Sequence, residues 1–61
     1  MLVLNTFTHH STVMIYILVG FVHVSGALLE WKAKHRDLAC VYAINAALHW
    51  ALGACHWAGL A

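Results

Sequence analysis

The sequence predicts an all-α membrane protein, an antiparallel hairpin of two transmembrane helices joined by a short basic loop. Three observations support this fold class. Hydrophobic residues make up 64% of the 61-residue chain and charged residues only 8%, whereas about a quarter of the residues in a soluble domain are charged. Every Lys, Arg, Asp and Glu falls in the window 30–37. The flanking segments, residues 1–29 and 38–61, contain no proline, so each can form the uninterrupted helix that lipid demands.

The composition also excludes several classes of protein. A soluble core in so short a chain would bury too little apolar surface to be stable unaided, and a disordered tail would be more charged and less hydrophobic. Three Lys or Arg residues are too few for a nucleic-acid interface. The uncharged segments carry no carboxylate, and the chain has no nucleophile–base constellation or phosphate-binding loop. We therefore expect a protein that is not an enzyme and has no soluble substrate.

The N-terminal half predicts an interfacial segment followed by a transmembrane helix. Residues 1–11 lack the positive charge of a secretory signal and are expected to lie in the membrane interface. Thr8 or Ser11 is the candidate N-cap of the helix that follows. That helix, residues 12–29, would be about 27 Å long, which is close to the thickness of the hydrocarbon core.

The charged window, residues 30–37, predicts the loop, with its turn centred near Ala33 or Lys34. It contains no glycine or proline, which usually mark turns, but a single continuous helix would place one apolar half in water. Asp37 is the predicted N-cap of the second transmembrane helix, residues 38–61, which would be about 36 Å long. Because the loop holds all the Lys and Arg residues, the positive-inside rule places it in the cytoplasm and both termini on the outer, periplasmic side.

Polar side chains gather on one face of each predicted helix. Polar groups in lipid need partners, so we expect these faces to meet, with the numbers of residues at equal depth adding up to about 67 or 68. His23 would then lie within hydrogen-bond reach of Asn45 or one water away from it, and Thr12 would lie in the same way near His56. The reverse packing, with small residues inward, is the alternative. The two faces consist of His9, Thr12, Tyr16, Gly20, His23, Ala27 and Glu30 on the first helix and Tyr42, Asn45, His49 and His56 on the second.

The other side of the second helix carries an unbroken line of small residues, here called the alanine ridge. Small residues allow helix backbones to approach closely in lipid. Since the hairpin supplies this helix with one neighbour only, we expect a helix of a larger membrane-protein subunit to dock along the ridge. The ridge consists of Ala43, Ala47, Ala51, Ala54 and Ala58.

Three of the six histidines lie within the predicted spans. His23 and His56 each occur in the pattern G-x-x-H-x-x-G, in which the glycines clear a flat shelf around a neutral imidazole, the usual axial ligand of a tetrapyrrole metal. In this respect the pattern resembles the histidines of helical haem proteins and bacterial antenna polypeptides. The candidate ligands of a haem or (bacterio)chlorophyll are therefore His23, His49 and His56, although no cofactor is required. The alternative role is hydrogen bonding between the helices.

A second group of histidines gives a weaker metal hypothesis. His9, His10 and His56 would lie at similar depth near the outer surface, where they could bind Zn²⁺ or Cu²⁺. No carboxylate or thiolate joins them.

These features predict a small non-catalytic accessory subunit of a larger energy-transducing complex, respiratory or photosynthetic, in an inner membrane. Its partners would be larger membrane-protein subunits and lipid. Two alternatives are a self-associating pore or toxin-like peptide and a histidine-based metal-handling membrane peptide.

Overall fold

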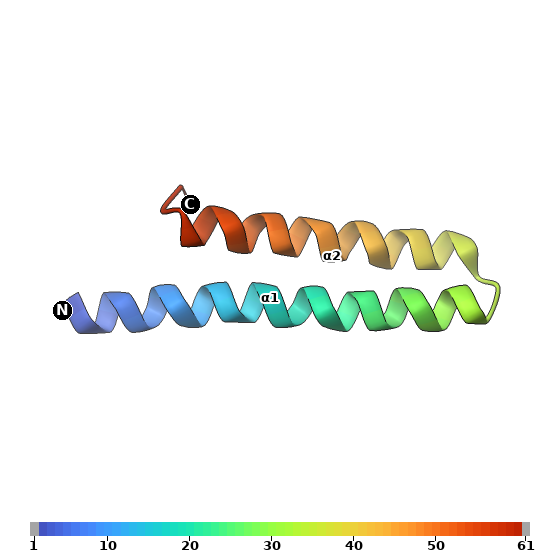
Figure 1. Cartoon of the computed structure of the whole chain (residues 1–61), viewed down its shortest axis with the longest axis horizontal. Coiled ribbons are helices and arrows are strands. Elements are labelled where there is room, and N and C mark those ends of the chain that lie inside the picture. Colours follow the sequence, from blue (N-terminus) through green and yellow to red (C-terminus); the bar gives the residue numbers. More distant parts are fainter. Residues whose placement is uncertain (1, 61) are drawn as a thin grey trace.

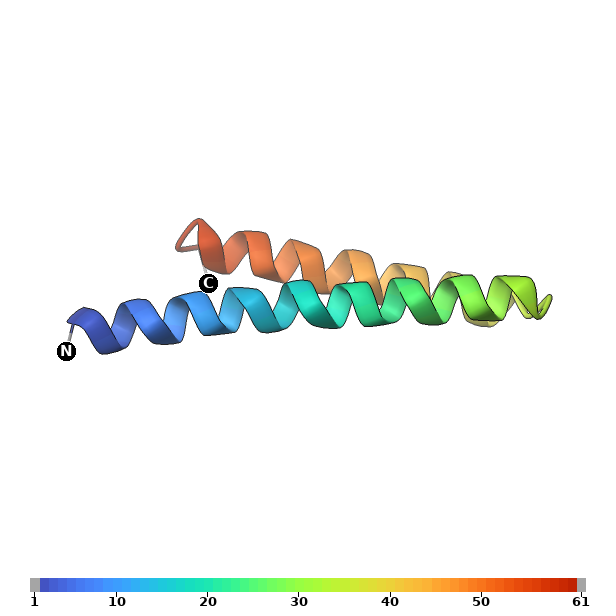
Figure 2. The ribbon, with the colours of Figure 1, turned by 60° about the horizontal axis from the view of Figure 1, so that its bottom comes forward.

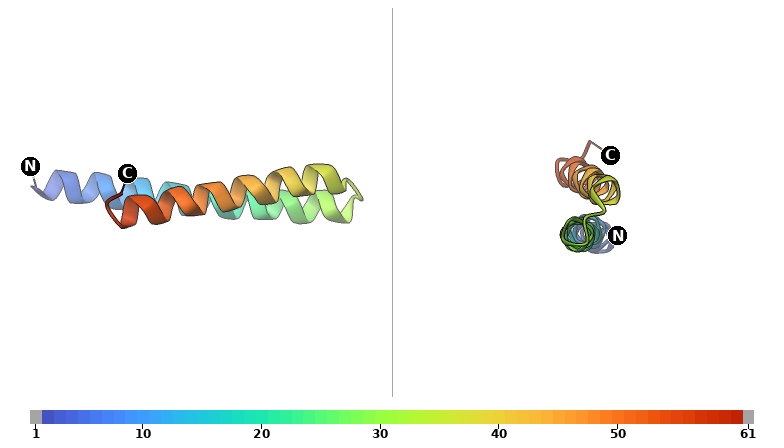
Figure 3. Two further views of the ribbon diagram at one scale, coloured as in Figure 1. Left: turned by 90° about the horizontal axis from the view of Figure 1, so that it is seen from above. Right: turned by 90° about the vertical axis from the view of Figure 1, so that its right-hand side faces the viewer.

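The computed structural model describes the backbone of residues 2–60 and the side chains of residues 6–60. Its two helices, α1 (Leu2–Lys32) and α2 (Arg36–Trp57), lie antiparallel and side by side (Figure 1). The Cα trace extends over 49 × 16 × 9 Å. The helices cross at a shallow angle (Figure 2), and the N-terminal end of α1 projects beyond the end of α2 (Figure 3). The predicted all-helical hairpin is confirmed.

Both helices are long and apolar enough to cross a membrane, judged by length and composition. The most apolar stretch of 18 residues has a mean hydropathy of 2.0 within Thr6–Lys32 and 1.5 within Arg36–Trp57. Among the described residues, the buried hydrophobic ones are Val13, Ala39 and Ala46, whereas eighteen large hydrophobic side chains are exposed. The hairpin therefore has almost no core of large apolar side chains. Small and polar residues make most of the contact between its helices.

The first helix begins earlier than predicted. It starts at Leu2 and runs without a break through residues 2–11, so Thr8 and Ser11 lie inside the helix and do not cap it. The chain has no proline, and its first glycine is Gly20. No strong helix breaker therefore interrupts the backbone hydrogen bonds of this segment.

The connection between the helices is shorter than the predicted loop. It comprises residues 33–35, because α1 continues to Lys32 and α2 begins at Arg36. The N-cap of α2 is His35, whose side chain makes no capping hydrogen bond. The predicted cap, Asp37, lies instead in the first turn of α2. Its negative charge there stabilises the helix by interacting with the positive end of the helix dipole.

The turn has the hydrogen bonds of a Schellman motif, with Lys34 in the position that glycine usually takes. Lys34 has a φ of 66°, so the predicted centre of the turn is confirmed. The His35 N–H donates to the Glu30 carbonyl oxygen at 2.8 Å, and the Lys34 N–H donates to that of Trp31 at 3.0 Å. A polar contact of 2.7 Å between His35 Nδ1 and Glu30 Oε2 takes the place of the usual apolar contact at these two positions.

The polar faces of the two helices meet, as predicted. Every residue of the polar face of α1 is buried or half-buried, as are Asn45, His49 and His56 on α2. The fourth member of the α2 face, Tyr42, is 37% exposed, although its ring contacts that of His23. All five alanines of the ridge are exposed on the other side of α2. The reverse packing, with the ridge inward, is therefore excluded in this hairpin.

Candidate functional site

The interface between the helices follows a seven-residue repeat in which large and small side chains alternate. Residues spaced alternately by three and four share one face of a helix, which is the spacing of a coiled-coil seam. A large residue on one helix can then face a small residue on the other. The seam positions are His9, Val13, Tyr16, Gly20, His23, Ala27 and Glu30 in α1 and Ala39, Tyr42, Ala46, His49, Gly53 and His56 in α2.

Five rings of this seam form a continuous series, here called the ring ladder: Tyr42, His23, His49, Tyr16 and His56. They come alternately from α2 and α1, and the distances between successive ring centroids are 5.8, 5.2, 6.1 and 5.3 Å. The rings of His23 and His49 are stacked, with 18° between their planes. Aromatic ring pairs of this kind contribute roughly 0.5–1.5 kcal/mol each, so the ladder holds polar side chains in the interface while joining the helices.

Two histidines of the ladder have a defined tautomer in their neutral form. Nδ1 of His23 lies 2.8 Å from the Val19 carbonyl oxygen, and Nδ1 of His49 lies 2.7 Å from the Asn45 carbonyl oxygen. A carbonyl oxygen only accepts, so each Nδ1 carries a proton and donates it, and Nε2 of the neutral ring keeps its lone pair. Metal-binding histidines are oriented in the same way by backbone carbonyls. The tautomer thus suits ligation through Nε2, and the space around the rings decides whether a cofactor fits.

Three glycines of the helices act as sockets for rings of the opposite helix. A Cβ atom at Gly20 would collide with the indole of Trp50. One at Gly26 would lie 3.0 Å from the ring of Tyr42, and one at Gly53 would lie 3.2 Å from Cβ of Tyr16. Small residues at these positions bring the helices together, which is their common role between membrane helices.

A tetrapyrrole does not fit the predicted ligands in this packing. The two glycines that flank His23 are covered by Trp50 and Tyr42, so no flat shelf is open beside its imidazole. His56 stacks on Tyr16 at 5.3 Å. His49 lies between the rings of His23 and Tyr16. The glycines of the two G-x-x-H-x-x-G patterns thus make room for side chains of the same chain, apart from Gly59, where an added Cβ atom would meet nothing within 4 Å.

The predicted pairs are not joined by direct hydrogen bonds. Among the described residues, no hydrogen bond joins His23 to Asn45 or Thr12 to His56. The ring of His23 lies between those of Tyr42 and His49, which stand on either side of Asn45 along α2. Thr12 Oγ1 donates to the Thr8 carbonyl oxygen at 2.8 Å. The depth matching itself holds, because the contacts between Tyr42 and Gly26 and between Trp50 and Ile17 join residues that it places level.

Trp50 is a contact residue that the sequence does not single out. Its indole Nε1 donates to the Ile17 carbonyl oxygen at 3.2 Å, and its ring meets Phe21 edge to face at 5.3 Å. The signal in the sequence is a glycine, Gly20, at nearly the same depth as a tryptophan on the other helix.

The outer histidines pack against an aromatic ring. The rings of His9 and His10 lie 6.1 and 5.6 Å from that of Trp57, whereas His56 lies on Tyr16. In the part of the chain whose side chains are described, no three His, Cys, Asp or Glu residues are close enough together to bind a metal ion. The hypothesis of a metal cluster at His9, His10 and His56 is therefore not supported.

The third candidate region is the alanine ridge, whose five residues are all exposed in the described part of the hairpin. At the end near the turn it adjoins an apolar groove of about 210 Å³, lined by Ala27, Leu28, Trp31, Ala39, Cys40 and Ala43. No known protein-family model, curated protein or solved structure matches this chain.

Proposed function

We propose that the chain is a small non-catalytic accessory subunit of a larger membrane-protein complex, inserted as a transmembrane hairpin and docked through the alanine ridge. The observation that carries this proposal is that one side of α2 contacts α1 while the ridge on its other side is exposed. The polar residues Asn45, His49 and His56 of α2 lie inside the hairpin, and the five alanines of the ridge are left exposed on the opposite side.

The exposed surface supports a membrane environment. The large hydrophobic side chains point outward along both helices, with Val22 68% and Leu29 67% exposed. Patches of this extent are rare on soluble monomers. In lipid the same surface is favourable. The histidines of the ring ladder are half-buried between the helices, where membrane proteins usually place polar groups.

The ridge supports docking of a protein helix. Association in lipid depends on close packing, since lipid tails are as apolar as the side chains that they meet. A helix placed along the ridge could approach the α2 backbone closely, and one of its side chains could enter the adjoining groove near Cys40. A pore built by self-association is less well supported, because the polar residues that would line its lumen lie between the two helices.

The histidines suggested a respiratory or photosynthetic complex, but within the hairpin they serve the ring ladder. We therefore propose membership of a membrane complex without assigning a tetrapyrrole to this subunit.

Purification of the tagged chain from its native membrane in mild detergent tests this function. We expect it to bring down larger membrane subunits in a fixed ratio. The double variant Ala47→Leu/Ala51→Leu should lose them, whereas Ser25→Leu, which enlarges an exposed position of α1, should retain them. Equal retention by both variants would exclude the ridge as the docking surface, and recovery of copies of this chain alone would favour self-association.

A further inference from the structure

The cationic side chains of the chain gather at the turn and lack carboxylate partners. Glu30 is engaged by His35, with 2.7 Å between Oε2 and Nδ1. Within residues 6–60, no ion pair is formed by Lys32, Lys34 or Arg36. All the fixed charges of the chain, three positive and two negative, thus stand at one end of the hairpin, where the three cations can meet an anion from outside.

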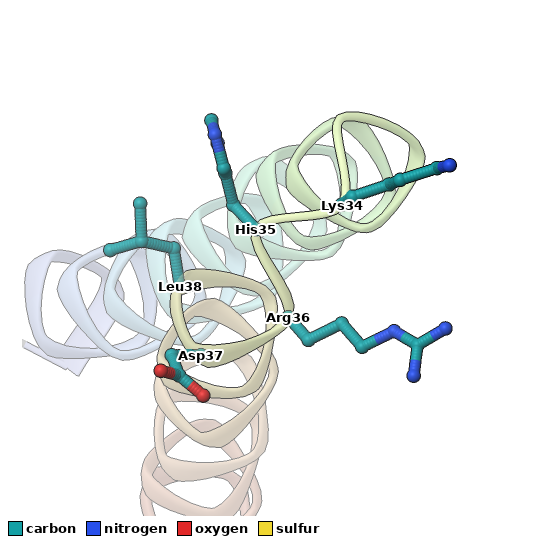
Figure 4. A pocket seen from close by; sticks show the side chains of 5 residues that line it. All are labelled: Lys34, His35, Arg36, Asp37 and Leu38. Carbon is teal, nitrogen blue, oxygen red and sulfur yellow. The ribbon is translucent and has the colours of Figure 1, made fainter.

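The turn also contains a cavity beside two of these cations. Its volume is about 420 Å³, and it is lined by Lys34, His35, Arg36, Asp37 and Leu38. Figure 4 shows that the side chains of Lys34 and Arg36 extend to the same side of the turn, while the Asp37 carboxylate lies away from both. Lys34 and Arg36 can therefore meet one anion there, while the Asp37 carboxylate, which also lines the cavity, weakens that attraction without standing between the two cations.

The surroundings of the cavity combine charge with apolar surface. The Arg36 guanidinium carbon lies 5.0 Å from the ring centroid of Trp31, and Trp31 and Leu38 are 54% and 51% exposed. Tryptophan beside a basic residue is typical of the depth at which lipid headgroups lie. The first intrahelical hydrogen bond of α2 is that from the Ala39 N–H to the His35 carbonyl oxygen, so the preceding N–H groups add donors at the positive end of the helix.

We infer that the turn binds the phosphate of an anionic phospholipid, with the phosphodiester between Lys34 and Arg36 and the acyl glycerol against Trp31 and Leu38. The apolar wall favours a lipid over free phosphate, because free phosphate would leave that wall exposed. This inference rests on the membrane placement in the proposed function and does not depend on the alanine ridge. Anionic lipid would hold the turn at the cytoplasmic leaflet, the side to which its charge assigns it.

The experiment uses the full chain labelled with fluorotryptophan in phosphatidylcholine nanodiscs. A minority of the lipid carries a nitroxide on its acyl chain, either as phosphatidylglycerol or as phosphatidylcholine. Fluorine NMR then compares the broadening of Trp31, at the turn, with that of Trp57, at the opposite end of α2. We expect labelled phosphatidylglycerol to broaden Trp31 more than Trp57, and labelled phosphatidylcholine to broaden the two alike.

Matched variants distinguish a specific lipid site from a general attraction between the basic turn and an anionic membrane surface. Arg36→Gln or Lys34→Gln should lower the preference about fivefold, the factor that corresponds to roughly 1 kcal/mol per basic residue near an anionic surface. Lys32→Gln removes the same charge outside the cavity and should lower it clearly less, and Asp37→Asn should raise it. Equal losses in all three cation variants would overturn the site.

Two controls define the source of the phosphate and the dependence on membrane insertion. Inorganic phosphate should reduce the preference no more than chloride of equal ionic strength, and a larger reduction would indicate a free-phosphate site and overturn the lipid assignment. Flotation of the chain with vesicles verifies insertion. Failure to float would overturn the membrane placement as well, whereas flotation with equal broadening by both lipids would overturn the lipid site alone.

Discussion

The indole of Trp50 reaches across the hairpin and donates its Nε1 hydrogen to the carbonyl oxygen of Ile17, 3.2 Å away. The absence of a side chain at Gly20 makes this possible, because a Cβ atom there would occupy the space of the indole. One glycine thus determines how closely the two helices approach at mid-length.

Replacing Gly20 with alanine should therefore destabilise the hairpin. Overpacking of a close contact costs about 1–3 kcal/mol, whereas Trp50→Phe, which keeps a ring but removes the hydrogen bond, should cost about 0.6 kcal/mol. Thermal unfolding in detergent, followed by circular dichroism, gives both values. Ser25→Ala on the exposed side of α1 is the control, and a Gly20→Ala variant as stable as this control would contradict the socket.

Replacing Lys34 with glycine should stabilise the turn. A left-handed backbone conformation costs a residue with a side chain roughly 1–2 kcal/mol relative to glycine, and Lys34 has a φ of 66°. Lys34→Ala loses the same charge but keeps the strain, so the difference between the two variants isolates the backbone. In thermal unfolding, Lys34→Gly should be the more stable of the two; equal stability would argue against the Schellman turn.

The neutral imidazoles of His23 and His49 should carry their proton on Nδ1. The reason is that both Nδ1 atoms face backbone carbonyl oxygens at 2.8 and 2.7 Å. Nitrogen NMR of histidine-labelled chain in bilayers distinguishes protonated from unprotonated ring nitrogens, and His10, whose side chain is exposed, serves as the reference. Protonation on Nε2 in either residue would show that its bond to the helix carbonyl is absent.

The turn should face the cytoplasm, with both termini on the other side. The three Lys and Arg residues all lie at the turn, and their retention on the cytoplasmic side governs orientation. A cysteine introduced as Ala33→Cys, in a chain with Cys40→Ser and Cys55→Ser, should resist membrane-impermeant thiol reagents in intact cells. Labelling of this cysteine in intact cells would show the opposite orientation, with the turn outside the cell.

The sequence predicted the features of the hairpin that depend on chemical class. A backbone in lipid forms helices, and the charged window separates the two. Polar side chains such as those of His23 and His49 contact one another between the helices, because lipid offers them no polar partner. Depth matching from a turn near Lys34 then placed Tyr42 level with Gly26, as found.

The features that the sequence did not reveal depend on local competition between groups. His23 and Thr12 bond to carbonyl oxygens four residues earlier on their own helix, because these acceptors are always within reach of such side chains. The burial of Ala46 and Gly53, more complete than that of the polar residues around them, depends on the exact rotation of α2. Periodicity alone does not fix that rotation.

The central claim, that α2 joins the hairpin through its polar face and a larger subunit through the alanine ridge, is tested most directly by oxygen accessibility at Ala47. A nitroxide is attached through Ala47→Cys in the chain with Cys40→Ser and Cys55→Ser, and at Val22→Cys on the exposed side of α1 as the control. In bilayers of the isolated chain both sites should collide freely with dissolved oxygen. In native membranes the accessibility at Ala47 should fall severalfold while that at Val22 is unchanged. Equal accessibility at Ala47 in the two preparations would mean that lipid, not protein, covers the ridge.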